Sequence, residues 1–479
     1  MRARLLAMIG VMVIAPLAGP AEAAPILTVD TLEDSFDGTC VDDCSLRDAI
    51  ASVDDGGTVR IGPGFYQLSL AGDGGIEAGD LDLDRPVTID GTGSLGAFLD
   101  ASALGDRAFD VATQASLHHL TLIGGSEVAS GGLVRVTAGT ARLIDSTLIG
   151  GVARNGGAVA VADGAALHIA RSWVSKTASS ERGGALFVRG TAAVVRSTIS
   201  EGQARAGGGA WVGEAGSLRL SDSTISGSSA QGGGGGLHVR GTAEIDSATI
   251  ARNASAVGGG VLASAAADVT TVASVFEGNE AIDRAPTCSR QIGSGGHNVA
   301  DTTGCGLDGV EDLEGVDPTV GPLRQNGGPT PTHALRIGSP AVGNGGDGCS
   351  RLDQRGAPRD DCDSGAYELV FCLGRPVTMV GTPANDDLTG GLGRDVFLGL
   401  AGDDDFQGSV AGDRACGGRG EDHLIGGPDD DRLSGAGGHD VLEGERGDDL
   451  LIGGAGRDEC LGDEGLDVAR RCEVATSAA

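Results

Sequence analysis

Ten aspartates in the carboxy-terminal part of the chain recur at a fixed nine-residue spacing, which could assemble a metal site. From residue 381 to residue 470 the chain divides without a gap into nine-residue units. Each unit has Gly at its first position and Asp at its sixth, and these aspartates are Asp386, Asp395, Asp404, Asp413, Asp422, Asp431, Asp440, Asp449, Asp458 and Asp467. Carboxylates and main-chain carbonyls are the hard oxygen ligands that suit Ca²⁺ at six or more contacts, whereas Mg²⁺ keeps its waters and demands tighter octahedral geometry. We therefore expect the ten aspartates to be calcium ligands.

The eighth position of each unit indicates the elements that hold these aspartates. It is apolar or small throughout: Leu388, Phe397, Phe406, Ala415, Leu424, Leu433, Leu442, Leu451, Cys460 and Ala469. We expect it to point inward on a three-residue strand, while positions one to six turn with their carbonyls exposed. Two units then make one turn of a flattened roll, so each unit stacks on the unit after next. Each stacked pair gathers carbonyls and two carboxylates, and the ten units allow at most about eight calcium ions.

The charge of this segment predicts that the metal also folds it. Residues 381–479 hold 23 Asp and Glu against 8 Lys and Arg, a net charge of −15 out of −33 for the whole chain. Stacked carboxylates a few ångströms apart repel by about 1 kcal/mol or more per pair unless a cation intervenes. We expect the segment to be largely unfolded without calcium, with binding energy supplying folding energy. The alternative is an acidic disordered tail.

Three units depart from the common pattern at their fourth position, where Gly is usual. The replacements are Ala384, Ala411 and Asp429. We expect the sites near Asp386, Asp413 and Asp431 to be the weakest.

The pattern resembles the repeats-in-toxin (RTX, hemolysin-type) calcium-binding nonapeptide, GGxGxDxUx. The resemblance covers about the last fifth of the chain. It implies a calcium-bound parallel β-roll over residues 371–479.

A second repeat, with a nearly constant step of about 26 residues, precedes the nonapeptides. Its central residues form one apolar series: Leu122, Leu148, Val174, Ile199, Ile225, Ile250 and Phe276. Glycine pairs interleave with the series, and aromatic residues are only 3% of the chain, too few for a broad core. Short strands separated by Gly-rich turns predict a parallel β-helix, with this series stacked inside and the preceding residues, mostly Thr, outside. We therefore expect an all-β fold: a right-handed parallel β-helix solenoid over residues 87–285, followed by the roll.

Three residues before the members of this apolar series lies a polar column, His119, Asp145, Arg171, Arg196 and Asp222. The column could be a binding strip for an acidic or neutral sugar. We favour the alternative, a solvated ladder of opposite charges.

The amino terminus predicts export. Arg2 and Arg4 precede an apolar run and the small residues near Ala23, the order of a cleavable signal peptide over residues 1–23. The apolar run is too short to span a membrane comfortably, and we expect no transmembrane segment after cleavage.

Residues 24–86 are expected to cap the first coil of the β-helix. The run from Cys40 to Ile50, CVDDCSLRDAI, resembles the CSLREA domain found ahead of bacterial β-helices, with Asp48 where Glu is usual. Ser45 and Asp48 also form a capping-box pattern that opens a short helix. Such a helix could cover the unpaired edge of the first coil.

Residues 286–370 resemble the choice-of-anchor Q region. The matching stretches include Gly296–Val299, Asn326–Leu335, Gly338–Ala341, Asp353–Gly356 and Cys362–Glu368. The resemblance implies the carboxy-terminal closure of a β-helix on an exported or surface protein, and it implies no reaction.

Ten cysteines in an exported chain favour disulfides over zinc or redox sites. Close spacing suggests Cys40–Cys44, Cys288–Cys305, Cys349–Cys362 and Cys460–Cys472, which leaves Cys372–Cys416. Sequence alone does not fix this connectivity.

Two functions from different classes follow from these features. The first, which we favour, is an exported calcium-binding structural or adhesive protein whose partner is an extracellular carbohydrate or a cell surface. The second is a β-helix polysaccharide lyase or hydrolase with a calcium-binding module. We expect no catalytic residues, because the coils lack long insertions for the walls of a groove, and the chain contains no HExxH, GxSxG or Walker motif. A net charge of −33 also argues against a nucleic-acid partner.

Overall fold

The computed structural model describes residues 26–41, 43–72, 75–93, 96–284 and 287–478, and this part of the chain is nearly all β. The expected signal peptide, residues 1–23, lies outside the described residues. Among the residues that are described, no helix is long and apolar enough to cross a membrane.

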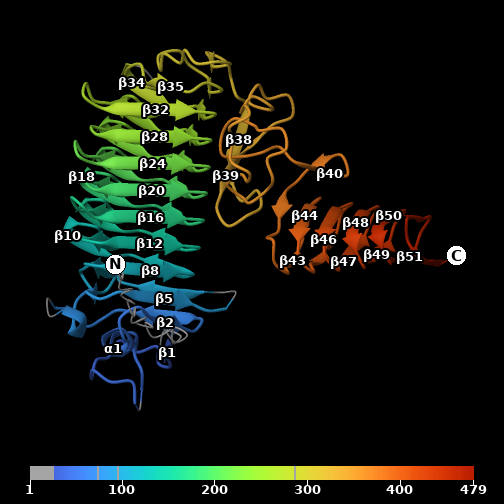
Figure 1. Cartoon of the computed structure of the whole chain (residues 1–479), viewed down its shortest axis with the longest axis horizontal. Helices are drawn as coiled ribbons and strands as arrows, with labels where there is room; N and C mark the ends of the chain where they lie inside the picture. Colours follow the sequence, from blue (N-terminus) through green and yellow to red (C-terminus); the bar gives the residue numbers. More distant parts are fainter. Residues whose placement is uncertain (1–25, 42, 73–74, 94–95, 285–286, 479) are drawn as a thin grey trace, which may run out of the picture.

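A parallel β-helix forms the larger body, in which each full coil adds a strand to each of four sheets (Figure 1). The first sheet contains β1 (Ile26–Val29), β2 (Gly57–Ile61), β5 (Val87–Gly91), β8 (Gln114–His118), β12 (Thr140–Ile144), β16 (Ala166–Ala170), β20 (Thr191–Val195), β24 (Ser217–Ser221), β28 (Thr242–Asp246), β32 (Asp268–Val272) and β35 (Gly293–Ser294). The second contains β3 (Gly64–Gln67), β6 (Ala97–Asp100), β9 (Leu120–Ile123), β13 (Thr147–Ile149), β17 (Trp173–Ser175), β21 (Thr198–Ser200), β25 (Thr224–Ser226), β29 (Thr249–Ala251), β33 (Val275–Glu277), β36 (Val299–Ala300) and β37 (Leu313–Glu314).

The other two sheets complete the coil. The third contains β10 (Ser126–Ser130), β14 (Val152–Asn155), β18 (Ala178–Arg182), β22 (Gln203–Ala206), β26 (Ser229–Gly233), β30 (Ala254–Val257) and β34 (Glu280–Arg284). The fourth contains β4 (Leu81–Leu83), β7 (Phe109–Val111), β11 (Val134–Val136), β15 (Val159–Val161), β19 (Leu186–Val188), β23 (Ala210–Val212), β27 (Leu237–Val239) and β31 (Val261–Ala263).

The predicted apolar series is confirmed as an interior column of the second sheet. Each member pairs in register with the next, from Leu122 with Leu148 to Ile250 with Phe276. All seven side chains are fully buried. The repeat therefore sets the register, because a slip by one residue would turn the whole series to the outer face.

The polar column marks the corner between the first and second sheets. Its five members, His119 to Asp222, all have positive φ between 44° and 54°. The next residue is a buried serine at several coils, and these serines form a ladder in which Ser146 N–H donates to Ser172 Oγ and Ser172 N–H donates to Ser197 Oγ. The corner is thus built from a strained backbone position followed by a hydrogen-bonded one.

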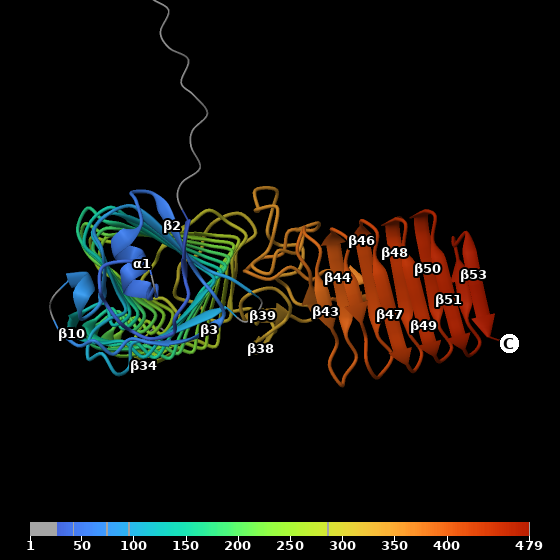
Figure 2. The same ribbon diagram turned by 90° about the horizontal axis from the view of Figure 1, so that it is seen from below.

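The amino-terminal end is covered by α1 (Leu46–Ser52), which lies across the opening of the β-helix (Figure 2). As the capping-box pattern predicts, Ser45 Oγ accepts a hydrogen bond from Asp48 N–H. The β-helix begins earlier than the expected boundary at residue 87, because strands β1 to β4 already pair within its sheets. A short 3₁₀ helix, η1 (Gly75–Glu77), lies between β3 and β4 within one of these coils.

The stretch expected to close the other end, residues 286–370, does so only in part. Strands β35 to β37 extend the first and second sheets. Residues 318–370, which we call the return segment, then run back along the flank of the β-helix and include the hairpin β38 (Val320–Arg324) and β39 (Thr332–Leu335) (Figure 1).

The threonines of the second sheet face outward, as predicted, and the return segment covers three of them. Thr198, Thr224 and Thr249 face outward, yet each is almost fully buried. Thr198 Oγ1 donates to Pro331 O at 2.6 Å, and Thr224 Oγ1 donates to Gln354 Oε1 at 2.7 Å. These side chains dock the return segment instead of facing solvent.

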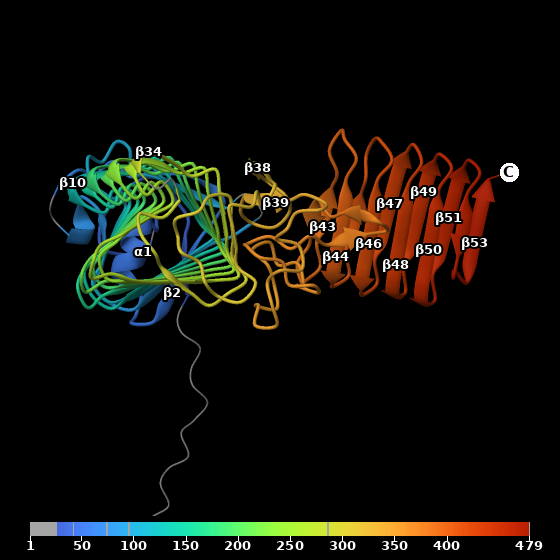
Figure 3. The same cartoon turned by 90° about the horizontal axis from the view of Figure 1, so that it is seen from above.

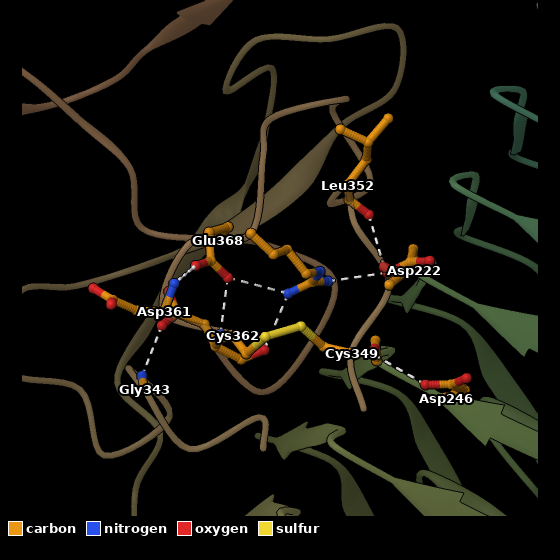
Figure 4. The surroundings of a disulfide bond; sticks show 12 residues. Asp222, Asp246, Gly343, Cys349, Leu352, Asp361, Cys362 and Glu368 are labelled. Atoms are coloured by element: carbon orange, nitrogen blue, oxygen red, sulfur yellow. Dashed lines mark hydrogen bonds and ion pairs between the residues drawn. A yellow bond between two sulfur atoms is a disulfide. The ribbon is translucent and has the colours of Figure 1, made fainter. Parts of the chain in front are cut away.

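The ten cysteines form five disulfides, and their pairing is the one expected: Cys40–Cys44, Cys288–Cys305, Cys349–Cys362, Cys372–Cys416 and Cys460–Cys472. Figure 4 shows the Cys349–Cys362 bond beside Asp222 and Glu368. Both carboxylates bind the buried guanidinium of Arg359, at 3.1 Å and 3.4 Å. The disulfide thus lies where the return segment meets the polar column.

The smaller body is a parallel β-roll that projects sideways from the β-helix, with its strands stacked crosswise to the solenoid (Figures 1 and 3). A short hairpin of β40 (Phe371–Cys372) and β41 (Arg375–Pro376) precedes it. One sheet contains β42 (Met379–Val380), β44 (Val396–Ala401), β46 (Arg414–Arg419), β48 (Arg432–Gly438), β50 (Leu450–Gly456) and β52 (Val468–Arg470). The other contains β43 (Asp387–Thr389), β45 (Asp405–Gln407), β47 (His423–Pro428), β49 (Val441–Arg446), β51 (Glu459–Glu464) and β53 (Val474–Ala478).

Candidate metal centre

The strand register places each nonapeptide on the one after next, as the sequence predicts. In one sheet Phe397 pairs with Ala415, and in the other Phe406 pairs with Leu424, in both cases two full units further along the chain. Eight of the ten position-eight side chains, from Phe397 to Cys460, are fully buried between the two sheets. Leu388 and Ala469, at the two ends of the roll, are less buried. This narrow core fixes where the turns, and hence the aspartates, stack.

The position-six aspartates form two continuous ladders, one along each edge of the roll. The backbone N–H of each aspartate donates to Oδ1 of the aspartate two units later. The eight donor–acceptor distances lie between 2.6 and 3.1 Å and join Asp386–Asp404, Asp395–Asp413, Asp404–Asp422, Asp413–Asp431, Asp422–Asp440, Asp431–Asp449, Asp440–Asp458 and Asp449–Asp467. All ten predicted residues are therefore brought together in stacked pairs.

The second carboxylate oxygen of most of these aspartates, Oδ2, takes no part in the ladder hydrogen bonds. Within the described residues, Oδ2 is buried and has no hydrogen-bond partner at Asp404, Asp413, Asp422, Asp431, Asp440, Asp449, Asp458 and Asp467. A buried acceptor without a partner is costly, and a buried charge more so. Eight equivalent orphaned oxygens in one register indicate a ligand that contributes positive charge.

The position-one glycines leave the space in which these oxygens lie. A Cβ built on Gly417 would meet Asp422 Oδ2 at 2.1 Å, and one built on Gly435 would meet Asp440 Oδ2 at the same distance. Carbonyls crowd the same place, because Gly417 O lies 2.3 Å from the Cβ position of Gly399. Carboxylate and carbonyl oxygens thus converge at each turn, a donor set that fits Ca²⁺.

Burial and like charges perturb the ladder electrostatically. Desolvation, followed by repulsion from neighbouring aspartates, raises the pKa of Asp404 to about 7 and that of Asp431 to about 8. Desolvation also raises the pKa of Asp413, Asp440 and Asp449 to about 6. Hydrogen bonds from the stacked backbone N–H groups oppose these rises. Burial and neighbouring negative charges therefore disfavour the ionised form of these carboxylates when no cation is bound.

The first aspartate of each ladder differs from the rest. Asp386 Oδ2 accepts a hydrogen bond from Thr382 N–H at 2.6 Å, and Asp395 Oδ2 accepts one from Gly391 N–H at 2.7 Å. Both carboxylates are only partly buried. Their second oxygens already have partners, so these two positions resemble the others least.

The fourth-position departures have a visible backbone consequence. Ala411 and Asp429 adopt positive φ values of 77° and 88°, a region that favours glycine. Asp413 and Asp431 nevertheless keep the ladder hydrogen bond and the orphaned oxygen. The departures thus strain the turn without displacing the carboxylates, and weak binding near these residues stays a prediction.

One carboxylate that the nine-residue period does not mark also joins a ladder. Glu473 Oε2 accepts a hydrogen bond from Asp458 N–H at 2.7 Å. Glu473 falls short of two full units beyond Asp458, so a search for the period passes over it. In the sequence, the feature that could have drawn attention to Glu473 is its direct neighbour, Cys472.

The polar column of the β-helix forms the neighbouring-charge contacts expected of a ladder. His119 Nδ1 lies 3.0 Å from Asp90 Oδ1, and Arg171 binds Asp145 through two nitrogens. Asp222 departs from the solvated ladder, because Arg359 and Ser350 of the return segment cover it.

Three members of the column also line the wall of a cavity of about 850 Å³. Asp145, Arg171 and Arg196 face Gln354 and Arg355 of the return segment, together with the first nonapeptide. This is the place in the described chain where the β-helix, the return segment and the roll meet around one hollow.

Comparison with known proteins assigns the roll to a family of repeats. Residues 380–414, 408–442 and 434–469 match the RTX calcium-binding nonapeptide repeat. The chain therefore carries calcium-binding RTX repeats. No curated protein matches its sequence.

Two solved structures are similar to the chain. The pectate lyase Pel9A is 13% identical with a TM-score of 0.39, and the match covers 72% of this chain and 97% of that one. The PL6 family alginate lyase AlyGC is 10% identical with a TM-score of 0.23, over 88% of this chain and 76% of that one. Similarity at these values says nothing about the activity of the present chain.

Proposed function

We propose that the protein is exported and that calcium folds and locks its carboxy-terminal roll, while the β-helix serves as a rigid structural or adhesive body. The observation that carries the proposal is the set of eight buried aspartate oxygens without a partner among the described residues. A cation at each stacked turn would supply the missing contacts and offset the mutual repulsion of the carboxylates.

The ligands would be the ten position-six aspartates, Asp386 to Asp467, together with carbonyls of the same turns. Bound calcium would supply the positive charge that these carboxylate and carbonyl oxygens could coordinate. The chain's own contribution is to stack the turns at one register and to exclude water through the apolar core. Binding to the folded state alone stabilises it by about 2.7 kcal/mol per site when free calcium is about 100 times the dissociation constant.

Export and surface location form part of the same proposal. The leader-like residues 1–23, the CSLREA-like segment and the choice-of-anchor Q-like segment support it, and five disulfides suit an oxidising compartment. A cell surface or an extracellular carbohydrate is the proposed partner.

The test is a calcium titration of the full mature chain, purified in chelator. We expect added calcium to increase the β-strand signal in circular dichroism and to create a calcium-dependent unfolding transition in calorimetry. Magnesium at the same concentration should do neither. A strand-rich spectrum that does not change with calcium would contradict the proposal.

A polysaccharide lyase or hydrolase is the second candidate. The cavity beside Asp145, Arg171 and Arg196 favours it, because these residues are the ones on the polar column that could bind or deprotonate an acidic sugar. Against it, Arg171 is already paired with Asp145. Release of unsaturated products from pectin, alginate or glycosaminoglycan would support this candidate, and loss of that release in Arg196→Ala would locate it.

A further inference from the structure

The last half-coil of the roll breaks the nine-residue period. Strand β53 pairs with β51 so that Glu459 lies opposite Val474, three positions short of two full units. Earlier coils pair at two full units, as where Val441 lies opposite Glu459. The shortening moves Glu473 into the place that position six would occupy.

Glu473 takes over the contact that an aspartate makes in every earlier step. Its Oε2 accepts from Asp458 N–H at 2.7 Å, as Asp458 Oδ1 accepts from Asp440 N–H at 3.1 Å. Asp458 is 1% exposed, and its Oδ2 is one of the buried oxygens without a partner in the described part of the chain. An orphaned acceptor therefore exists at this turn as it does at the internal ones, although no further aspartate of the period stacks on it.

The same half-coil also supplies a carbonyl. Arg471 O lies 2.2 Å from the Cβ position of Gly453, matching the 2.3 Å between Gly417 O and the Cβ position of Gly399. Arg471 lies two full units after Gly453, so the carbonyl keeps the regular register and only the carboxylate is shifted. Cys472 lies between Arg471 and Glu473, and its disulfide to Cys460 ties this half-coil to the buried core of the roll.

We propose that Glu473 completes a ninth calcium site with Asp458, which closes the carboxy-terminal end of the roll. This inference rests on the proposed calcium function of the roll. Glu473 and Asp458 provide the carboxylates, and Arg471 provides a main-chain oxygen. The ten nonapeptides alone offer eight stacked pairs, so the period undercounts the sites by one.

The experiment counts calcium on the intact holo-protein by native mass spectrometry and follows hydrogen exchange of β53. Glu473→Gln should remove one calcium ion and the calcium-dependent protection of β53. Glu464→Gln is the matched control, because it removes the same charge from the neighbouring strand, where the exposed side chain pairs with Arg446. It should change neither quantity.

The outcomes separate the two proposals. A wild-type chain that carries no calcium would overturn the proposed function and, with it, this inference. A wild-type chain that carries calcium while Glu473→Gln carries the same number, with β53 equally protected, would overturn the ninth site alone. An unchanged melting transition of the β-helix in the variant shows that the rest of the chain is folded.

Discussion

At the scale of single residues, the metal chemistry of the roll depends on a glycine and an aspartate five positions apart. The Asp422 carboxylate lies against Gly417, so that one of its oxygens occupies the space of a missing side chain. No positive φ is required at Gly417, and therefore its role is to admit the carboxylate and not to relieve backbone strain.

The pair Gly417 and Gly437 tests this role. A methyl group at Gly417 would meet Asp422 Oδ2 at 2.1 Å, whereas at Gly437 the nearest atom would be Gly418 O at 3.7 Å. We expect Gly417→Ala to lose at least one bound calcium ion and to cost about 1–3 kcal/mol of roll stability, the usual range for overpacking. Gly437→Ala should behave as wild type. Equal calcium content in the two variants would contradict the prediction.

Removing the carboxylate charge gives a second residue-scale prediction. Asp422→Asn combined with Asp440→Asn should lower the number of calcium ions found by equilibrium dialysis and lower the calcium-dependent melting temperature. The two amides keep the size of the side chains, so a loss would come from charge and coordination. Unchanged uptake and melting would show that these aspartates are not ligands.

The raised pKa values predict how the calcium-free roll responds to pH. Because burial raises the pKa of Asp404 to about 7 and that of Asp431 to about 8, the folded roll holds protons that the unfolded chain releases near pH 4. Its stability is therefore greatest in acid and is lost as the pH rises through about 6 to 8. In calcium-depleted buffer we expect more β-strand signal at about pH 4.5 than at about pH 8.5. The same signal at both values would contradict this.

At the scale of elements, the sequence predicts the contacts that recur in every coil and does not predict the contacts that occur only once. The interior column from Leu122 to Phe276 could be read from its spacing, since every coil needs the same apolar contact. The burial of Thr224 could not be predicted in this way, because the residue that buries it, Gln354, lies far along the chain in the return segment. Glu473 was missed for the same reason: its position depends on a shortened register that only the pairing of β53 reveals.

The serine ladder at the corner of the β-helix gives an element-scale prediction. Ser172 accepts from Ser146 N–H, but at the corresponding place Ala248 has no side-chain oxygen to offer Ser223 N–H. We expect Ala248→Ser to complete the ladder and stabilise the β-helix by about 1 kcal/mol, the typical net value of one hydrogen bond. Ser197→Ala should destabilise by about 1–3 kcal/mol, because Ser172 N–H would be left buried without its acceptor. Thermal unfolding of both variants checks the pair, and a lower melting temperature for Ala248→Ser would contradict it.

At the scale of the whole molecule, the two bodies differ in what stabilises them. The β-helix has a continuous apolar core, whereas the roll has a column of eight buried side chains, a small apolar cluster at its start and the acid-rich turns. Its charge excess of −15 makes the roll the part that depends on solution conditions.

Limited proteolysis with a glutamyl endopeptidase should separate the two bodies. In chelator we expect cleavage within the roll, at residues such as Glu421 and Glu443, while the β-helix stays intact. Saturating calcium should protect the roll. Glu421 and Glu443 lie outside the Cys372–Cys416 and Cys460–Cys472 loops, so fragments cut at these residues separate without reduction. Cleavage of both bodies at the same rate, with or without calcium, would contradict the prediction.

The return segment constrains how this architecture can vary in evolution. It is fastened to three successive coils through Thr198, Thr224 and Thr249, so its length is matched to the rise of those coils. A duplicated coil among them would pull the attachment points out of step and displace the roll. A coil duplicated ahead of residue 140 would lengthen the rod and leave every anchor in place. Homologues should accordingly differ in length on the amino-terminal side and keep a constant number of coils beside the anchors.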